Sequence, residues 1–294
     1  MSREERTNSI LQYILPSIEK HQNSENAQST GKPFILGLTG LQGCGKSTLA
    51  TDIVTALNNK HSYHAIEISL DDFYKKHSER QELRNQYPSN KLLKVRGQPG
   101  THDITLASWF FSQFTIPEPG TSTTKIELPV FDKSLFNGDG DRLPRSEWRV
   151  FPKQPPIQII VFEGWCVGFS PLKSQEIEDK WNRARQSRAL SQPEPALPAT
   201  SSVESKYSIT TVADHSLEDL LFVNSQLVGY HERFMGPEHL DFLVHLDTLD
   251  LKTVYMWRSE QERKLRESRG TGMTDSQVIE FGKSDKLALT GSIC

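Results

Sequence analysis

Short apolar runs alternate along the chain with longer segments that have helical spacing. Four runs are rich in large apolar residues and have the length of buried strands: 34–38, 65–70, 157–162 and 242–246. After the first run, the segment 48–58 carries an apolar residue every four positions, which predicts a helix with one buried face. Strands that alternate with helices are typical of a parallel sheet covered on both faces. We therefore predict an α/β fold with a mostly parallel, doubly wound sheet.

The pattern predicts two less regular regions outside these elements. Apolar residues at helical spacing over 9–19 predict an N-terminal helix, and the polar stretch after it predicts a linker, so that residues 1–32 form one N-terminal part. Residues 184–206 are rich in Ser, Pro, Ala and Gln and show no periodicity. Such a composition predicts a disordered insertion at the surface.

The composition excludes several classes of protein. The chain has 294 residues and a formal net charge of −3, so its charge gives no reason to expect nucleic acid or an anionic membrane as a partner. No run approaches the roughly 18 apolar residues of a membrane span, and the charged N-terminus is not typical of a secretory signal. The three cysteines lack metal-site spacing and are too few for a disulfide scaffold. We expect a cytoplasmic protein, with the nucleus left open as a second compartment.

Residues 40–47 read Gly-Leu-Gln-Gly-Cys-Gly-Lys-Ser, the complete G-x-x-x-x-G-K-[ST] pattern of a phosphate-binding loop. The loop lies between a predicted strand and a predicted helix, a context that a chance match would lack. Its glycines let backbone N–H groups converge on phosphate oxygens at a helix N-terminus. Lys46 would reach the β- and γ-phosphates of a nucleoside triphosphate, and the Ser47 hydroxyl would bind Mg²⁺. The predicted nucleotide-binding residues are Gly40, Gln42, Gly43, Cys44, Gly45, Lys46, Ser47 and Thr48.

Acidic residues follow the predicted strands, at the edge where parallel sheets bind ligands. Asp71 and Asp72 follow the second strand; one of them can accept the proton of an alcohol, while the other faces metal-bound water or caps the following turn. The alternative is that both cap a helix. Glu163 follows four apolar residues at the end of the third strand, as a Walker B acid does, and we expect it to hold Mg²⁺ together with Ser47.

A charged helix is predicted over 256–269, and the Gly-Thr-Gly sequence after it is typical of a hinge. This segment fits a lid that closes Arg258 over the triphosphate and excludes water. A salt-bridged surface helix is the alternative. With the phosphate-binding loop, these features predict a three-layer sandwich of the P-loop NTPase type with a helical lid.

Taken together, the motifs give the chain a resemblance to the D-glycerate 3-kinase family and its fungal ATP-binding relatives, which are close to the pantothenate, uridine and phosphoribulokinase-like P-loop kinases. The resemblance extends from about residue 33 to 281, apart from the Ser/Pro-rich insertion, and this span would be the kinase domain. Besides the phosphate-binding loop, it rests on the segments 69–74, 96–103, 131–134, 138–142, 162–165, 255–258 and 272–275.

The resemblance implies an ATP- and Mg²⁺-dependent kinase that phosphorylates a hydroxyl group of a small organic acid similar to glycerate. It favours Asp71 over Asp72 as the catalytic base. Lys46, Glu163 and Arg258 are the other expected catalytic residues. The segments 96–103 and 133–142 would line the acceptor site with cations suited to a carboxylate or phosphate, although glycine-rich structural turns are the alternative for both. The implied acceptor-site residues are Asp72, Tyr74, Arg96, His102, Asp103, Lys133 and Arg142.

Residues 282–294 depart from the family pattern, which continues with a further helix and a last strand. We therefore expect an atypical, truncated C-terminal tail. This departure leaves an ATP-binding regulator or pseudoenzyme as one alternative function. A nucleoside or pantothenate kinase, which shares the fold, is another.

Overall fold

The structure of the chain is a computed structural model that describes residues 2–41, 43–114, 124–190 and 212–247, together with Arg263 and Glu267. Several sequence predictions lie outside the described residues. They concern Gln42 of the phosphate-binding loop, Arg258 of the charged helix, and the C-terminal tail 282–294.

In the described part of the chain, the core is a parallel sheet of four strands in the order β2-β7-β1-β8. The strands are β1 (Phe34–Gly40), β2 (Ala65–Ser69), β7 (Ile159–Glu163) and β8 (Phe242–Leu246). They correspond to the four predicted strands, with boundaries that differ by two residues at most. β1 and β7 are buried along their whole length because they are the two inner strands, which explains their unbroken apolar runs. The predicted α/β fold is confirmed.

The register of the sheet brings the carboxyl ends of its strands together. Leu38 of β1 and Ser69 of β2 both lie opposite Glu163 of β7. On the other side of β1, Gly40 lies opposite Leu246 of β8. The loops that follow β1, β2 and β7 therefore leave the sheet side by side.

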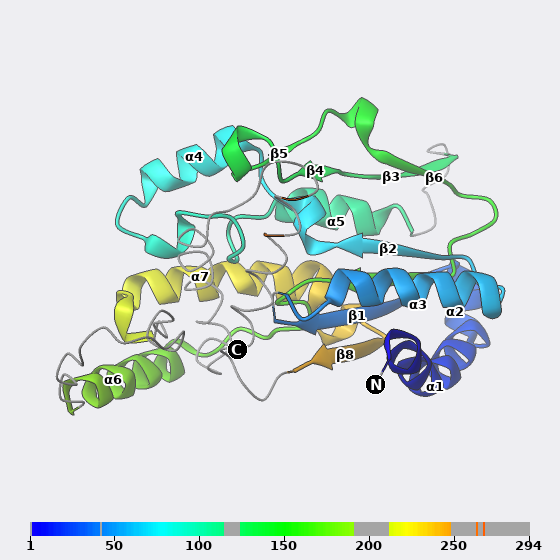
Figure 1. The fold of residues 1–294 in the computed structure, drawn as a ribbon, viewed down its shortest axis with the longest axis horizontal. Coiled ribbons are helices and arrows are strands. Elements are labelled where there is room, and N and C mark those ends of the chain that lie inside the picture. The colour runs from blue at the N-terminus through cyan, green and yellow to red at the C-terminus, as the bar shows by residue number, and fades with distance from the viewer. Residues whose placement is uncertain are drawn as a thin grey trace.

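Helices cover both faces of this sheet, which gives three layers (Figure 1). On one face, α1 and α3 pack against β1, with Ile14 and Leu36 in one buried cluster. On the other face, α5 and α7 pack against β7, with Phe110 and Ile160 in a second cluster. These helices are α1 (Arg3–Gln22), α3 (Lys46–Lys60), α5 (Ile104–Ser112) and α7 (Leu217–Tyr230).

Two short antiparallel ribbons and a helix lie beyond the edge strand β2, above it in Figure 1. They are α4 (His77–Gln86), β3 (Lys125–Leu128) paired with β6 (Arg149–Pro152), and β4 (Phe131–Asp132) paired with β5 (Asp141–Arg142). Short 3₁₀ helices cover Leu70–Phe73, Lys91–Leu93, Phe136–Gly138, Arg145–Glu147, Val212–Asp214 and Pro237–His239, and a π-helical turn covers His231–Met235.

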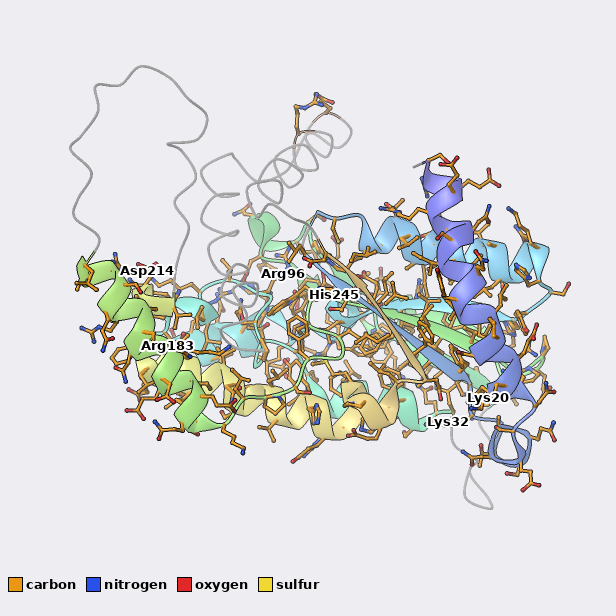
Figure 2. All side chains as sticks on the ribbon, turned by 90° about the horizontal axis from the view of Figure 1, so that it is seen from below. Lys20, Lys32, Arg96, Arg183, Asp214 and His245 are labelled. Carbon is orange, nitrogen blue, oxygen red and sulfur yellow. The ribbon has the colours of Figure 1, made fainter. Side chains whose placement is uncertain are left out.

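Helix α6 (Ser174–Leu190) lies at the end of the molecule opposite to α1 and α2 (Glu25–Thr30). Figure 2 shows Arg183 at this end and Lys20 at the other. Ile177 of α6 and Leu220 of α7 belong to a small separate apolar cluster. None of the described helices has a stretch long and apolar enough to cross a lipid bilayer.

Two sequence predictions are wrong in their boundaries. The predicted polar linker contains the helix α2 (Glu25–Thr30), whose N-terminus is capped by the Ser24 hydroxyl. The predicted insertion begins too early, because α6 continues to Leu190. An ion pair of 2.5 Å between Arg188 and Asp214 holds its last turn. In both places, polar residues form a helix through caps and ion pairs, which a search for apolar periodicity does not detect.

The contribution of α1 to the core can be tested at Ile14, whose side chain is fully buried. Ile14→Ala is expected to lower the free energy of unfolding by about 2–5 kcal/mol, because it leaves a cavity between α1 and the sheet. Urea denaturation followed by circular dichroism measures this. Tyr13→Ala is the matched control on the same helix: Tyr13 is 72% exposed, so its effect should stay within about 0.5 kcal/mol. Equal, small effects of both variants would show that α1 is not part of the core.

Candidate active site

Strand β1 leads into the phosphate-binding loop, and α3 begins directly after the loop. Gly40 has a φ of 149°, and a Cβ at this position would lie 2.4 Å from the carbonyl oxygen of Leu246, so the loop can start here only from a glycine. Gly45 is the N-cap of α3 with a φ of 88°, and no side chain in the described part of the chain caps this helix. The N–H groups of its first turn are therefore available to an anion.

The Lys46 side chain lies inside the loop rather than in solvent. It is 8% exposed, and its Nζ donates a hydrogen bond to the carbonyl oxygen of Leu41 at 2.8 Å. A buried ammonium group with a neutral partner still attracts an anion. The loop thus combines backbone N–H groups and one positive charge, which is the arrangement that binds polyphosphate.

Ser47, in the first turn of α3, meets Glu163 at the end of β7. The Ser47 hydroxyl donates a hydrogen bond to the Glu163 carboxylate at 3.0 Å. Burial, followed by the charge of Asp71, raises the pKa of Glu163. The described residues contain no group of three or more His, Cys, Asp or Glu side chains that could hold a metal ion. Two oxygen donors suit Mg²⁺, which uses few protein ligands and completes its shell with phosphate and water.

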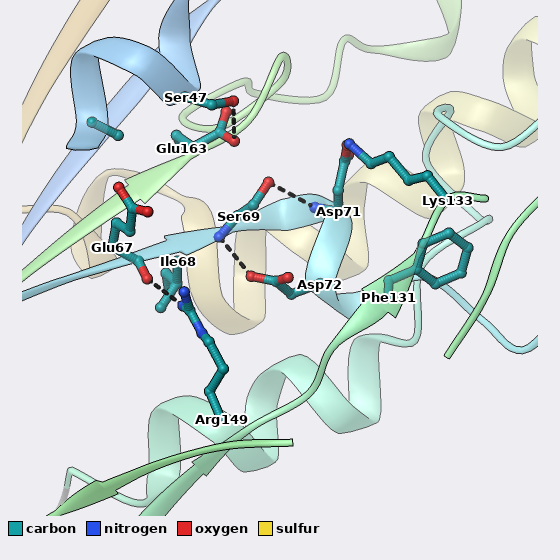
Figure 3. A pocket seen from close by; sticks show the side chains of 11 residues that line it. Ser47, Glu67, Ile68, Ser69, Asp71, Asp72, Phe131, Lys133, Arg149 and Glu163 are labelled. Carbon is teal, nitrogen blue, oxygen red and sulfur yellow. Dashed lines mark hydrogen bonds and ion pairs between the residues drawn. The ribbon is translucent and has the colours of Figure 1, made fainter. Parts of the chain in front are cut away.

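The two aspartates after β2 have different surroundings (Figure 3). Asp72 accepts a hydrogen bond of 3.0 Å from the N–H of Ser69 and so caps the short helix that begins at Leu70. Asp71 points the other way, toward Lys133, and the two side chains form an ion pair of 2.5 Å. One aspartate thus stabilises the turn, and the other faces the end of the sheet where the phosphate-binding loop lies.

The same surroundings separate the acidities of the two carboxyl groups. Burial alone would raise the pKa of Asp71, but the Lys133 ammonium outweighs it and holds the pKa well below its usual range. Burial raises the pKa of Asp72 to about 6, although the Ser69 N–H and nearby cations oppose this shift. At neutral pH, Asp71 is therefore an ionised hydrogen-bond acceptor.

These groups surround a cavity of about 290 Å³. The cavity lies where α3, β2, β7 and the short strands β4 and β6 meet, and Figure 3 shows its lining. Its size suits a small molecule or a small part of a larger one. The lining residues are Ser47, Ala50, Glu67, Ile68, Ser69, Asp71, Asp72, Phe131, Lys133, Arg149 and Glu163.

Two charged lining residues were missed by the sequence analysis, Glu67 and Arg149. Arg149 begins β6, and its Nη2 donates a hydrogen bond to the carbonyl oxygen of Glu67 at 2.6 Å. The Oε2 atom of Glu67 is buried, with no hydrogen-bond partner in the described part of the chain. Glu67 could have been found as the single charge in an apolar strand. Arg149 offered no such signal, because its strand was not predicted.

Several of the predicted acceptor-site residues bond to other loops and are not part of the cavity lining. Arg142 donates to the carbonyl oxygen of Tyr74 at 2.7 Å and forms an ion pair of 3.0 Å with Asp103. Asp103 also caps α5 by accepting the N–H of Leu106. Among the described residues, Tyr74, Asp103 and Arg142 are not part of the cavity lining. The side chains of Asp103 and Arg142 join loops, and the Tyr74 side chain forms a hydrogen bond with Asp71.

Arg96 and His102 are also absent from the cavity lining and interact with other parts of the protein. Arg96 is buried and donates a hydrogen bond to the carbonyl oxygen of Gly138. His102 is stacked on Tyr74 with ring centres 4.3 Å apart, and its Nδ1 lies 2.9 Å from the hydroxyl of Tyr230. Burial lowers the pKa of His102 to about 3, so its imidazole carries no positive charge at neutral pH. Of the predicted acceptor-site residues, Asp72 and Lys133 lie at the cavity.

Comparison with known proteins gives several relatives, although no protein-family model matches the chain. An uncharacterized kinase of Schizosaccharomyces pombe is 36% identical over 273 residues, which cover 92% of this chain and 83% of that protein. A probable ATP-dependent kinase of Saccharomyces cerevisiae is 28% identical over 280 residues, which cover 94% of this chain and 83% of that protein. The solved structure of D-glycerate 3-kinase from Cryptococcus neoformans matches with a TM-score of 0.75 and 29% identity, covering 96% of this chain and 88% of that one.

The raised pKa of Asp72 predicts a pH-dependent effect on stability. Its pKa is about 6 in the folded chain, against an ordinary 3.8, so the free energy of unfolding should fall as pH rises from about 4 to 6 and buried Asp72 loses its proton. Asp72→Asn keeps an oxygen for the Ser69 N–H but carries no charge. We expect this variant to become more stable than the parent by on the order of 1–3 kcal/mol at pH 7 and to show a smaller difference at pH 4.

Urea denaturation of the parent and of Asp72→Asn at both pH values measures the effect. The result to compare is the difference in the free energy of unfolding between the two proteins, because titrating groups other than Asp72 are present in both. A difference that does not change between pH 4 and pH 7 would contradict a raised pKa of Asp72.

Proposed function

This chain belongs to the family of D-glycerate 3-kinases and fungal ATP-dependent kinases, and from this premise we propose that it transfers the γ-phosphoryl group of ATP to a hydroxyl group of a small organic acid similar to glycerate. As a member of this family it is a P-loop kinase, that is, a phosphotransferase. One observation carries the finer proposal. Asp71, the Ser47–Glu163 pair and the cations Lys133 and Arg149 surround one small cavity next to the phosphate-binding loop.

The donor side of the reaction uses the loop and the first turn of α3. The backbone N–H groups there would bind the phosphates of ATP, with Lys46 exchanging its bond to Leu41 for the β- and γ-phosphate oxygens. Ser47 and Glu163 would hold Mg²⁺. When bound, Mg²⁺ supplies positive charge that neutralises these phosphates. We place Arg258, which lies outside the described residues, on a lid over the triphosphate.

The acceptor side uses Asp71. Its ionised carboxylate would accept a hydrogen bond from the acceptor hydroxyl and take the proton as the new O–P bond forms and the bond between the γ-phosphorus and ADP breaks. The low pKa of Asp71 makes it a weak base, which suits a reaction in which positioning of the hydroxyl matters more than early proton removal.

Two cations in the cavity lining support a small anionic acceptor, although the carboxyl groups of Glu67, Asp71, Asp72 and Glu163 also line the cavity and Asp71 is paired with Lys133. Lys133 and Arg149 bring two cations to a space of about 290 Å³, and guanidinium and ammonium groups bind carboxylates strongly. Among the described lining residues, Phe131 is the one aromatic side chain. Nucleobases are usually held by apolar and aromatic contacts. The lining therefore favours a hydroxy acid over a nucleoside as the acceptor.

A kinase assay with the purified chain tests the proposal. ATP and MgCl₂ would be supplied with D-glycerate, other small hydroxy acids, nucleosides and pantothenate, and ADP release and phosphorylated product would be measured. We expect product from a hydroxy acid. If only a nucleoside or only pantothenate gave a phosphorylated product, the chain would belong to another class of kinase. If no compound gave a product, the proposed kinase activity would be refuted.

Asp71→Asn is expected to lower kcat by about 10²- to 10⁴-fold, because the amide cannot take the acceptor proton. ATP affinity should change little, since Asp71 lies on the acceptor side of the cavity. Asp179→Asn on the exposed face of α6 makes the same chemical change outside the cavity and should leave kcat unaltered. Equal kcat values for Asp71→Asn and the parent would exclude Asp71 as the base.

Arg149→Gln tests the acceptor class. We expect the KM for the hydroxy acid to rise roughly 10- to 100-fold with kcat changed only a few-fold, because a charge-assisted hydrogen bond to the carboxylate is lost. Arg145→Gln is the matched control: Arg145 is ion-paired with Glu127 on the neighbouring strand and does not line the cavity. Steady-state kinetics would count against the proposal if both substitutions gave the KM of the parent.

A further inference from the structure

The N-terminal helix α1 is anchored beside the phosphate-binding loop by two kinds of contact. Its apolar face, with Leu11, Ile14 and Ile18, is buried against the sheet and α3. Near its N-terminus, Arg3 forms a two-point ion pair with Asp52 of α3, in which one hydrogen bond measures 2.6 Å. The first turns of α1 are therefore fixed relative to α3, the helix that starts at the loop.

Arg6 follows Arg3 by about one turn of α1, and its side chain lies at the phosphate-binding loop. The Nη2 atom of Arg6 lies 3.7 Å from the position that a Cβ on Gly45 would occupy, and Gly45 is the N-cap of α3. The guanidinium is also close enough to act on Cys44: burial raises the pKa of this thiol, and the charges of Lys46 and Arg6 oppose the rise. Arg6 is thus a second cation at the loop, contributed by a distant part of the sequence.

Unlike Arg3, Arg6 has no hydrogen-bond or ion-pair partner for its side chain among the described residues. Its Nε atom is buried without a hydrogen bond, and no carboxylate in the described part of the chain forms an ion pair with its guanidinium. Buried polar atoms in proteins are nearly always hydrogen-bonded, and exceptions call for an explanation. An unpaired guanidinium next to free helix N–H groups and a buried lysine is explained if its partner is an anion from outside the chain.

We propose that Arg6 binds the phosphate groups of the nucleotide, so that α1 is part of the nucleotide site. The inference rests on the proposed use of ATP and adds a residue outside the loop motif to it. A guanidinium offers several donors in a fixed plane and forms paired hydrogen bonds to phosphate oxygens, which an ammonium group cannot do. The ligand class is a nucleoside di- or triphosphate, and the contact is to its phosphates rather than to its base.

Calorimetry on the full chain with Mg²⁺–ADP, a non-hydrolysable ATP analogue and adenosine tests this inference. Arg6→Gln is expected to weaken ADP and the ATP analogue about 10- to 100-fold and to leave adenosine binding unchanged. Arg6→Lys should give an intermediate affinity for both nucleotides. Arg3→Gln is the matched control on the same helix: it should lower the melting temperature and keep nucleotide affinity within about twofold of the parent.

The possible results separate this inference from the proposed function. If the parent binds ADP and Arg6→Gln binds it equally well, the inference is wrong and the proposed function stands. If Arg6→Gln weakens adenosine as much as ADP, Arg6 only shapes the site and the inference is also wrong. If the parent binds no nucleotide, both are wrong. Should Arg6→Gln not fold, Arg6→Lys carries the test, and an affinity equal to that of the parent overturns the inference.

Discussion

The parallel register of β2, β7 and β1 is the constraint on which the site depends. Because Ser69 and Leu38 both lie opposite Glu163, the residues that follow these strands must leave the sheet at the same level. The hydrogen bond from Ser47 to Glu163 and the position of Asp71 follow from this alignment rather than from local sequence. A shift of one strand by one residue would turn its side chains to the other face and separate Ser47 from Glu163.

Two groups of positive side chains among the described residues have different surroundings. Arg80 and Arg96 are buried and Arg142 is half-buried. All three donate to backbone carbonyl oxygens, mostly in the turn around residues 138–140, so their charge is used to fix loops. Burial lowers the pKa of Arg80, which shows what this placement costs. Lys133 and Arg149 instead lie at the rim of the cavity. Arg80 and Arg96 also lie over the ring of Phe131, which lines the cavity.

Much of the fold was predictable, because its strong signals are local. The strands of the main sheet carry apolar runs, and the loop motif fixes Lys46 and Ser47 relative to the helix that follows. The strands of the small ribbons could not be predicted, since each has two to four residues and β6 exposes Arg149 and Val150. Such short strands form because they pair with a strand that is distant in the sequence. This pairing leaves no periodic pattern in the strand's own residues.

The site was predictable where a side chain follows directly from a strand end, as for Asp71 and Glu163. It was not predictable where the direction of a side chain depends on packing between distant segments. His102 and Arg142 lie in two segments with the family pattern, yet His102 stacks on Tyr74 and Arg142 donates to the carbonyl oxygen of Tyr74. Arg6 lies about 35 positions before the loop motif and reaches it only because α1 packs on α3.

Gly40 gives the sheet a mechanical property. A methyl group at this position would collide with the carbonyl oxygen of Leu246, so the loop and the end of β8 are in van der Waals contact across the sheet. Asp247 follows Leu246 and is the last residue of this described segment. Any movement of the end of β8 would therefore push on, or pull away from, the residue at which the proposed phosphate site begins. Steric contact of this kind responds to displacements of a few tenths of an ångström, because packed interiors have little compressibility.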